Sequence, residues 1–494
     1  MRDENAKTNA RTNRDGDGGD GGDPASGAGP MPGAGAGAGT GAGLDHGPGG
    51  VRVEVVRGVD ALPEGLWQRL APPDDPMWAR EVFAAMEKGR IGPEGYAYVL
   101  LWRGEHAVAV LPLSLFRGLR LDDVVGPRER RALAPVRRWA PRALRVPMLF
   151  CGNLLGQGHL LFDGSPTRDE ARLLVGAVKD FARRERFGTV VFKDFGPDAL
   201  PTLWEALGEA GFFTVPSLPD TELSLGHASF DAYVAALPAK PRRNARSKLR
   251  KIAAMPGLRT RVVADWAPLV PAMLALYGQV MARADQTLDV LDADFLASLA
   301  PPAGGPEVPT DGRGTGGAQD SRVVACFQDD RLVAFLLCLF AGDGAVGARI
   351  GLDYELAHDA RLYHAAHYAA IRLALERGCR HIRFAQTAYV PKLELGCTLV
   401  EQTYALTHLG PLRRGLLRRL LPPALARARA DALRGAHEVT GTPSAARTTA
   451  RAAPGAFAAP WSPPAPRSSP ASRASRDPRA SRPGREDRNV ACPE

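Results

Sequence analysis

The sequence predicts an α/β chain with mixed sheets, built as two tandem domains of one fold. The first observation is a pair of eighteen-residue stretches with one pattern, "VLLWRGEHAVAVLPLSLF" at 99–116 and "VVACFQDDRLVAFLLCLF" at 323–340. Each is an apolar run, a polar break and a second apolar run, which is typical of a β-hairpin. The second observation is that the elements after the two hairpins also match, in the same order.

The segment after each hairpin predicts a helix and then a strand. "ARLLVGAVKDFARRERFGTVVFKDF" at 171–195 aligns with "ARLYHAAHYAAIRLALERGCRHIRFAQT" at 360–387, and both begin with Ala-Arg-Leu. We expect the helices to end at Gly188 and Gly378, because glycine suits the end of a helix. Apolar residues recur at helical spacing in the second segment; they are Leu362, Ala366, Ala370 and Leu373.

A third match completes the repeat. Residues 203–225 and 392–409 each predict a short helix, a glycine and a last strand. Three matched elements in one order favour duplication of an ancestral unit. Two unrelated α/β units with ordinary βαβ order remain the alternative.

Composition divides the 494-residue chain into body and tails. Residues 1–50 are rich in Gly and Asp, and residues 431–494 are rich in Ala, Pro, Arg and Ser. Because such segments bury too little apolar surface to fold, we expect two disordered tails. Between them we expect a first domain at 51–226 and a second at 227–410, with a mobile Gly- and Pro-rich loop at 301–321.

Charge and apolar runs limit the classes of function. The chain carries a net charge of +9, and residues 411–430 alone hold six basic and no acidic side chains. The body therefore has no strong excess of positive charge, which argues against DNA binding. No apolar run approaches the ~20 residues that span a bilayer. With no signal-like N-terminus and no CxxC pair, we expect a cytoplasmic protein with buried thiols.

Two regions carry a resemblance to a known family. Residues 51–116 contain "LWQRLAPPDDPMWAREVFAAMEKG", and residues 229–409 contain "SFDAYVAALPAKPRRNARSKLRKI", "AIRLALERGCRHIRF" and "YVPKLELG". They resemble Fem-related proteins and the BioF2-like, or FemAB-like, acetyltransferase domain of the GNAT superfamily. The resemblance implies two tandem GNAT-like domains and an acyl-CoA-dependent N-acyltransferase. It also implies an amine acceptor, a small molecule or a cell-wall precursor, held in the cleft between the domains.

The segment "AKPRRNARSKLRKI" at 239–252 predicts a strongly basic helix with Pro241 in its first position. One stripe is apolar (Ala245, Leu249, Ile252), and the other faces are basic. Seven like charges predict an anionic substrate, such as a phosphate-bearing one. A solvated helix paired to acids elsewhere is the alternative. The substrate-binding candidates here are Arg242, Arg243, Arg246 and Lys248.

The turn "LAHDARLY" at 356–363 leads into the second predicted helix. The resemblance implies that the donor diphosphate binds at this helix start, through free backbone N–H groups and the helix dipole. The glycine-containing turn usual in GNAT proteins is missing, and Asp359 is expected to be the N-cap. A plain capped helix is the alternative. The donor-binding candidates are Asp359, Ala360, Arg361 and Leu362.

The segment "FAQTAYVPKLELG" at 384–396 places polar side chains after a predicted strand. The resemblance implies that Lys392 assists acyl transfer, where a fixed ammonium would stabilise the charge on the carbonyl oxygen. Tyr389 would protonate the leaving group or orient the acceptor. Gln386 is a further substrate-binding candidate. The alternative for Lys392 is a surface position at a helix start.

Residues 411–430 predict a basic helix with leucines on about half of its surface. One interpretation is peripheral association with an anionic membrane, at the inner face of the cell membrane. The other is a terminal helix packed on the second domain. His358, His364 and His367 cluster without a third ligand, so we expect no metal site.

The favoured function is therefore an N-acyltransferase of the GNAT type, in cell-envelope or polysaccharide biosynthesis. A Fem-type aminoacyltransferase that uses aminoacyl-tRNA on a peptidoglycan precursor is the runner-up. The span 252–300 holds several prolines and no heptads, so a tRNA-binding helical arm is less expected there. A catalytically degenerate GNAT pair that only binds is the third possibility.

Overall fold

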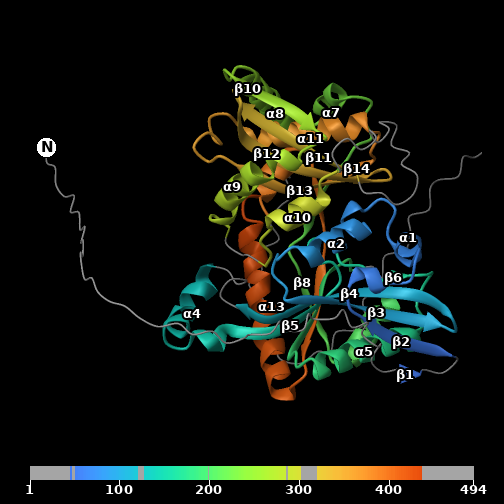
Figure 1. Ribbon diagram of the computed structural model, residues 1–494. Helices are drawn as coiled ribbons and strands as arrows, with labels where there is room; N and C mark the ends of the chain where they lie inside the picture. Colours follow the sequence, from blue (N-terminus) through green and yellow to red (C-terminus); the bar gives the residue numbers. More distant parts are fainter. Residues whose placement is uncertain are drawn as a thin grey trace, which may run out of the picture. The chain divides into compact units, whose positions relative to one another are not determined.

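The computed structural model describes residues 45–46, 50–120, 127–197, 200–284, 288–301 and 320–436 (Figure 1). Residues 1–442 form one compact unit, and the other unit, 443–494, lies outside the described part. Nearly all of the predicted tail at 1–50 and of the predicted loop at 301–321 also lies outside it. Among the described residues, no helix is both long and apolar enough to cross a bilayer.

The first sheet has nine strands, in the order β1-β2-β3-β4-β5-β7-β16-β8, with β6 paired to β4. Its β3–β4 hairpin contains the first repeated stretch of the sequence. The strands are β1 (Asp45–His46), β2 (Val51–Val56), β3 (Gly95–Arg103), β4 (His106–Arg120), β5 (Arg145–Cys151), β6 (Leu161–Phe162), β7 (Thr189–Phe195), β8 (Phe213–Pro216) and β16 (Thr403–His408).

The second sheet has seven strands, in the order β10-β11-β12-β13-β14-β9-β15. Its β11–β12 hairpin contains the second repeated stretch. The strands are β9 (Asp220–Ser224), β10 (Leu258–Val263), β11 (Asp320–Gln328), β12 (Arg331–Ala341), β13 (Gly344–Leu352), β14 (His381–Arg383) and β15 (Thr398–Val400).

The two sheets have the same pairing pattern. Starting from β2 and from β10, three antiparallel pairs are followed by one parallel pair and two antiparallel pairs. The parallel pairs are β5–β7 and β13–β14, and the repeated hairpins hold equivalent positions. The predicted mixed α/β fold with two tandem units is confirmed.

The units exchange one strand each. β9 follows β8 in sequence but lies in the second sheet, between β14 and β15. β16 follows β15 but lies in the first sheet, between β7 and β8. Each of the predicted domains, 51–226 and 227–410, thus supplies one strand to the other's sheet.

Helices cover both sheets, and a shared core contains residues of both. Buried apolar residues of α5 pack on the first sheet, and those of α11 and α7 pack on the second. The helices are α1 (Leu66–Leu70), α2 (Arg80–Lys88), α4 (Pro127–Trp139), α5 (Arg168–Arg184), α6 (Pro201–Glu209), α7 (Phe230–Ala236), α8 (Ala239–Ala253), α9 (Val270–Met281), α10 (Ala293–Leu299), α11 (Leu362–Glu376), α12 (Tyr389–Glu394) and α13 (Pro411–Ala432).

The two matched long helices end differently. α11 ends as predicted, because Gly378 follows its last turn in the left-handed conformation (φ 71°). α5 ends earlier than predicted, and Arg186 takes the left-handed conformation (φ 62°) in place of Gly188. The ring of His408 explains Gly188 instead, since a Cβ there would lie 2.9 Å from His408 Nε2.

Two helix boundaries differ from those predicted from the sequence. α8 begins at Ala239, so Pro241 is its third residue rather than its first, and a proline without an N–H is tolerated throughout the first turn. α13 continues to Ala432, beyond the predicted start of the tail at 431. Leu433 and Ala436 are buried against Tyr389 and Leu393, which explains why the fold extends that far.

Candidate active site

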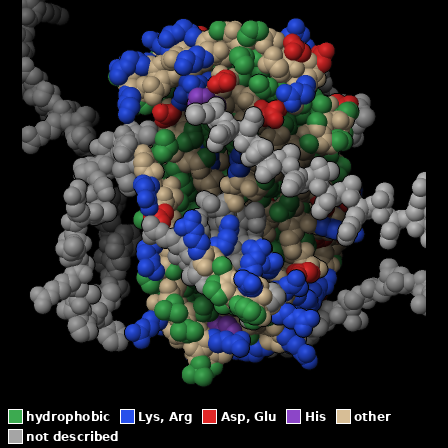
Figure 2. Space-filling model, turned by 90° about the vertical axis from the view of Figure 1, so that its left-hand side faces the viewer, with side chains coloured by type: hydrophobic (Ala, Val, Ile, Leu, Met, Phe, Trp, Pro, Cys, Tyr) green, Lys and Arg blue, Asp and Glu red, His purple; other side chains and the backbone are tan. Residues whose placement is uncertain are grey.

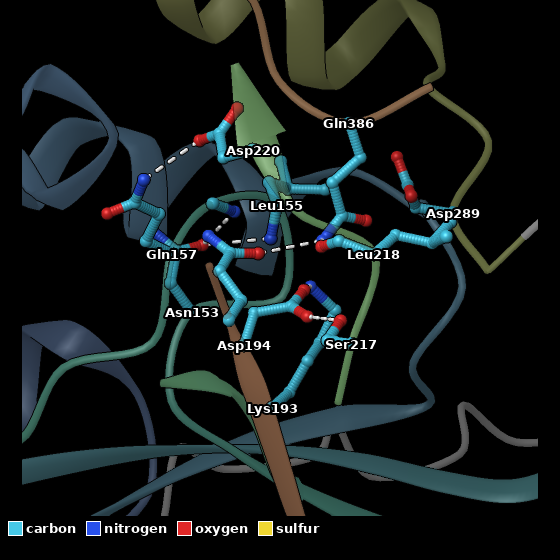
Figure 3. A network of polar contacts seen from close by, with 12 residues as sticks. Asn153, Leu155, Gln157, Lys193, Asp194, Ser217, Leu218, Asp220, Asp289 and Gln386 are labelled. Atoms are coloured by element: carbon cyan, nitrogen blue, oxygen red, sulfur yellow. Dashed lines mark hydrogen bonds and ion pairs between the residues drawn. The ribbon is translucent and has the colours of Figure 1, made fainter. Parts of the chain in front are cut away.

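A buried polar network lies where the chain crosses between the sheets (Figure 3). Residues 217–219 lead from β8 in the first sheet to β9 in the second, and residues 401–402 lead from β15 back to β16. The two crossings bond to each other, because the Ser217 N–H donates to the Gln402 carbonyl at 2.9 Å. The network therefore joins the ends of both exchanged strands.

Lys392 is the residue through which α12 joins this network. Its Nζ donates to the carbonyls of Ala385 (2.8 Å) and Gln386 (2.9 Å), and the residue is 4% exposed. Burial lowers the pKa of Lys392 to about 8. The alternative that Lys392 is a surface residue is therefore wrong, because α12 places it in the interior.

The loop that Lys392 binds has an unusual backbone. Ala385, Thr387 and Ala388 all have positive φ, at 57°, 66° and 47°. Left-handed conformations of residues other than glycine are costly and persist only where surrounding contacts hold them. The two bonds from Lys392 are such contacts, so this side chain positions the loop directly after β14.

Asp220 is the buried carboxylate on the other side of the network. One oxygen accepts from Gln157 Nε2 at 3.0 Å and the other from the Thr221 N–H at 2.6 Å. Burial raises the pKa of Asp220, with opposing contributions from Gln157, Thr221 and the positive charge of Lys392. A carboxyl group with a raised pKa is a candidate acid or base.

Gln386 connects the loop to the crossing segments. Its side-chain amide donates to the Leu218 carbonyl (2.9 Å) and to Gln402 Oε1 (2.8 Å). Ser217 in turn donates to Asp194, which also pairs with Lys193 at the end of β7. Figure 3 shows the Asp220–Gln157 and Asp194–Ser217 contacts in one view with Gln386. Polar groups from the ends of β7 and β14 thus share one network.

Tyr389 is held in the same interior. It is 2% exposed, and its hydroxyl donates to the Pro219 carbonyl at 2.8 Å. Burial raises the pKa of Tyr389, so its hydroxyl keeps its proton. The structure brings Tyr389, Lys392 and Gln386 together, as the sequence predicts, but Tyr389 and Lys392 lie in a packed interior and Gln386 is partly exposed.

The basic helix α8 contacts α12. Lys248 Nζ lies 2.5 Å from Glu394 Oε2 and 2.8 Å from His364 Nε2, so it is engaged within the fold. Arg242 donates to the Ala235 carbonyl. Arg243 and Arg246 are exposed and are the members of this group that an anionic substrate would reach first.

The start of α11 differs from the prediction. Arg361, not Asp359, is the N-cap, and its left-handed backbone (φ 51°) lets the chain turn into the helix without a side-chain cap. Ala360 and Leu362 are buried, so they would offer a ligand only their backbone. Asp359 is exposed and lies beside His358.

β13 and β14 separate close to this helix start. They pair only at residues 344–346 with 381–383, although β13 continues to Leu352. Residues 347–352 therefore have no β14 partner on that edge. α11 is the next element after β13 in the chain and contacts it.

Six polar residues of the network were missed in the sequence: Gln157, Lys193, Asp194, Ser217, Asp220 and Gln402. Asp220 had the clearest signal, as an acid directly after Pro219 at the start of a predicted strand. His364 and His367 serve the fold: His367 Nδ1 contacts the Tyr363 carbonyl, and burial lowers the pKa of His367 to about 3. The five cysteines in the described ranges are buried and unpaired.

Comparison with known families gives one match, to part of the second half of the chain. Residues 239–390 match the acetyltransferase (GNAT) domain family. No curated protein matches the chain.

Three solved structures are similar to the chain at low identity. A tandem GNAT protein from the clavulanic acid biosynthesis pathway is 15% identical, with 73% of this chain and 99% of that chain covered and a TM-score of 0.43. FemX is 11% identical, with 69% of this chain and 94% of that chain covered and a TM-score of 0.42. L-PGS from Bacillus licheniformis is 9% identical, with 73% of this chain and 96% of that chain covered and a TM-score of 0.41. The match at residues 239–390 supports the GNAT part of the resemblance seen in the sequence.

Proposed function

We propose that the protein is an N-acyltransferase that moves an acyl group from an acyl-CoA thioester to an amine. The observation that carries this proposal is the early separation of β13 from β14 within the GNAT domain. An unpaired strand edge presents N–H and C=O groups that an extended, amide-bearing ligand can pair with. The pantetheine arm of coenzyme A carries two amides and has that character.

The donor diphosphate would lie at the first turn of α11. Helix starts offer free N–H groups and the positive end of the helix dipole. Arg361 adds a charge at the same place, although the glycine-containing turn is missing. Arg243 and Arg246 of α8 are a second source of positive charge for an anionic acceptor or donor.

Transfer would proceed by direct attack of the amine on the thioester carbonyl. The bond from nitrogen to carbon forms, the carbon–sulfur bond breaks, and coenzyme A leaves as the thiol after taking up a proton. Lys392 donates two of its three N–H groups to backbone carbonyls, and within the described residues the third has no hydrogen-bond partner. That third N–H is the group we assign to the developing oxyanion. Tyr389 would protonate the leaving group or orient the acceptor amine, as proposed from the sequence.

The acceptor is proposed as an amine of a cell-envelope or polysaccharide precursor, or a small molecule. Aminoacyl-tRNA is a less favoured donor, because α9 and α10 have only 12 and 7 residues and make no long helical arm. A module that binds without catalysis is the second candidate. The missing glycine turn and the full burial of Tyr389 and Lys392 favour it.

Replacement of Arg361 by glycine tests the donor site. Glycine takes the φ of 51° without strain, so the variant removes the charge and keeps the turn. We expect acetyl-CoA affinity, measured by isothermal titration calorimetry, to fall by about tenfold or more. The control Arg250→Ala, at an exposed position of α8, should bind like the wild type.

The titration also separates the three functions. Acetyl-CoA binding with loss in the glycine variant supports the proposal. Binding of aminoacyl-tRNA alone would support the Fem-type alternative. If the protein binds neither acetyl-CoA nor aminoacyl-tRNA, the result would support the third function, a module that binds without catalysis.

A further inference from the structure

The C-terminal helix α13 has two apolar faces, and only one of them is covered. Leu417, Leu421 and Leu425 recur at i, i+4 and i+8 and pack on the core beside β8 and β16. A second stripe at the same spacing points outward, with Leu412 89% exposed, Leu416 58% and Leu420 56%. These three are among the most exposed large apolar side chains in the described ranges.

The outward stripe is flanked by positive charge. Arg413, Arg418 and Arg419 are exposed, and no ion pair joins any of them to another described residue. The helix contains no acidic side chain before Asp431. Figure 2 shows the left-hand side of Figure 1, on which α4 lies in front of α13, and its lower half shows Lys and Arg side chains among hydrophobic ones, with few acids.

A groove runs along the flank of the same helix. Its volume is about 480 Å³, and Trp204, Leu207 and Phe213 form its apolar walls. Arg418 and Pro422 of α13 line its other side. The indole N–H of Trp204 is buried without a hydrogen-bond partner among the described residues. A groove with aromatic and aliphatic walls and one arginine beside it fits an acyl chain that ends in an anionic group.

We propose that α13 docks on an anionic membrane surface. The outward leucines enter the boundary between headgroups and acyl chains, the arginines pair with lipid phosphates, and the groove takes part of one acyl chain. Charge favours this occupant over two others. Residues 437–494 carry nine basic and five acidic side chains, and a second copy would present the same arginines, so like charges oppose both. The proposal is independent of the acyl-transfer chemistry.

Co-sedimentation of the full-length chain with vesicles tests this docking. Vesicles of equal parts phosphatidylcholine and phosphatidylglycerol should bind the wild type, and vesicles of phosphatidylcholine alone should not. Arg413→Gln with Arg419→Gln should weaken binding by about tenfold or more. Replacement of Leu412, Leu416 and Leu420 by asparagine should weaken it at least as much. Both variants alter exposed positions and should keep the circular dichroism spectrum and the acetyl-CoA affinity of the wild type.

Arg250→Gln with Lys251→Gln on α8 is the control, because it removes equal charge from another exposed site and should bind vesicles like the wild type. Three results would overturn the proposal. They are no binding to anionic vesicles, equal losses in the control and α13 variants, and self-association that depends on the leucines while vesicle binding is absent.

Discussion

Replacement of Lys392 by methionine is expected to reduce kcat for acyl transfer by about a hundredfold or more, because it removes the ammonium assigned to the oxyanion. It also takes the donor from the carbonyls of Ala385 and Gln386, so at pH 10 and above, where the buried lysine is neutral, the free energy of unfolding should fall by about 2 kcal/mol. Steady-state kinetics and urea unfolding measure the two effects. Lys251→Met, at an exposed position of α8, is the matched control and should change neither.

The stability of the wild type and that of the Lys392→Met variant should depend differently on pH. The pKa of Lys392 is lowered from 10.5 to about 8, so between these values the unfolded chain binds more protons than the folded one. The contribution of this lysine to stability therefore rises with pH across that window, by roughly 3 kcal/mol in all. The methionine variant lacks the rise. Unchanged turnover in the variant would remove the catalytic assignment, and unchanged amide exchange at 385–388 would show that Lys392 does not hold the loop.

The strand exchange predicts that neither half folds alone. A fragment of residues 1–226 lacks β16, which separates β7 from β8 in the first sheet. A fragment of residues 227–494 lacks β9, which pairs both β14 and β15 in the second. In an NMR spectrum, the amide protons of each fragment should show the narrow chemical-shift dispersion of an unfolded chain. Mixing the two fragments should restore the wide dispersion of a folded protein. A folded, monomeric 227–494 fragment would contradict the exchange.

A point variant tests the same exchange in the intact chain. Leu223 of β9 is buried in the core of the second sheet, so Leu223→Ala should cost about 2–5 kcal/mol of stability. Ser224→Ala, the exposed neighbour on the same strand, should be nearly neutral. Faster amide exchange in β14 of the leucine variant would locate the loss in the second sheet.

Local signals in the sequence predicted the repeated elements well. The hairpins, the α11 stripe from Leu362 to Leu373 and the glycine end at Gly378 depend on period and turn chemistry, which are readable from neighbouring residues. The exchange was not readable, because the partners of β9 and β16 are set by contacts more than a hundred residues away along the chain. The same long-range pairing explains why Asp220 was missed as part of the site.

For the candidate site, the sequence predicts which residues lie close together but not how the backbone holds them. The sequence correctly brought Tyr389, Lys392 and Gln386 together, since they share one short segment. It could not show that Lys392 bonds to backbone carbonyls of a left-handed loop, because backbone conformation at Ala385 and Ala388 has no sequence signal there. Nor could it show that Arg361 would replace Asp359 at the start of α11.

Amide hydrogen exchange of the full-length chain, with and without acetyl-CoA, tests donor binding at the opening between β13 and β14 most directly. Donor binding there should slow exchange at residues 347–352 of β13 and in the first turn of α11 and leave the rest of the second sheet unchanged. Slower exchange confined to the first sheet, or none anywhere at saturating acetyl-CoA, would contradict it.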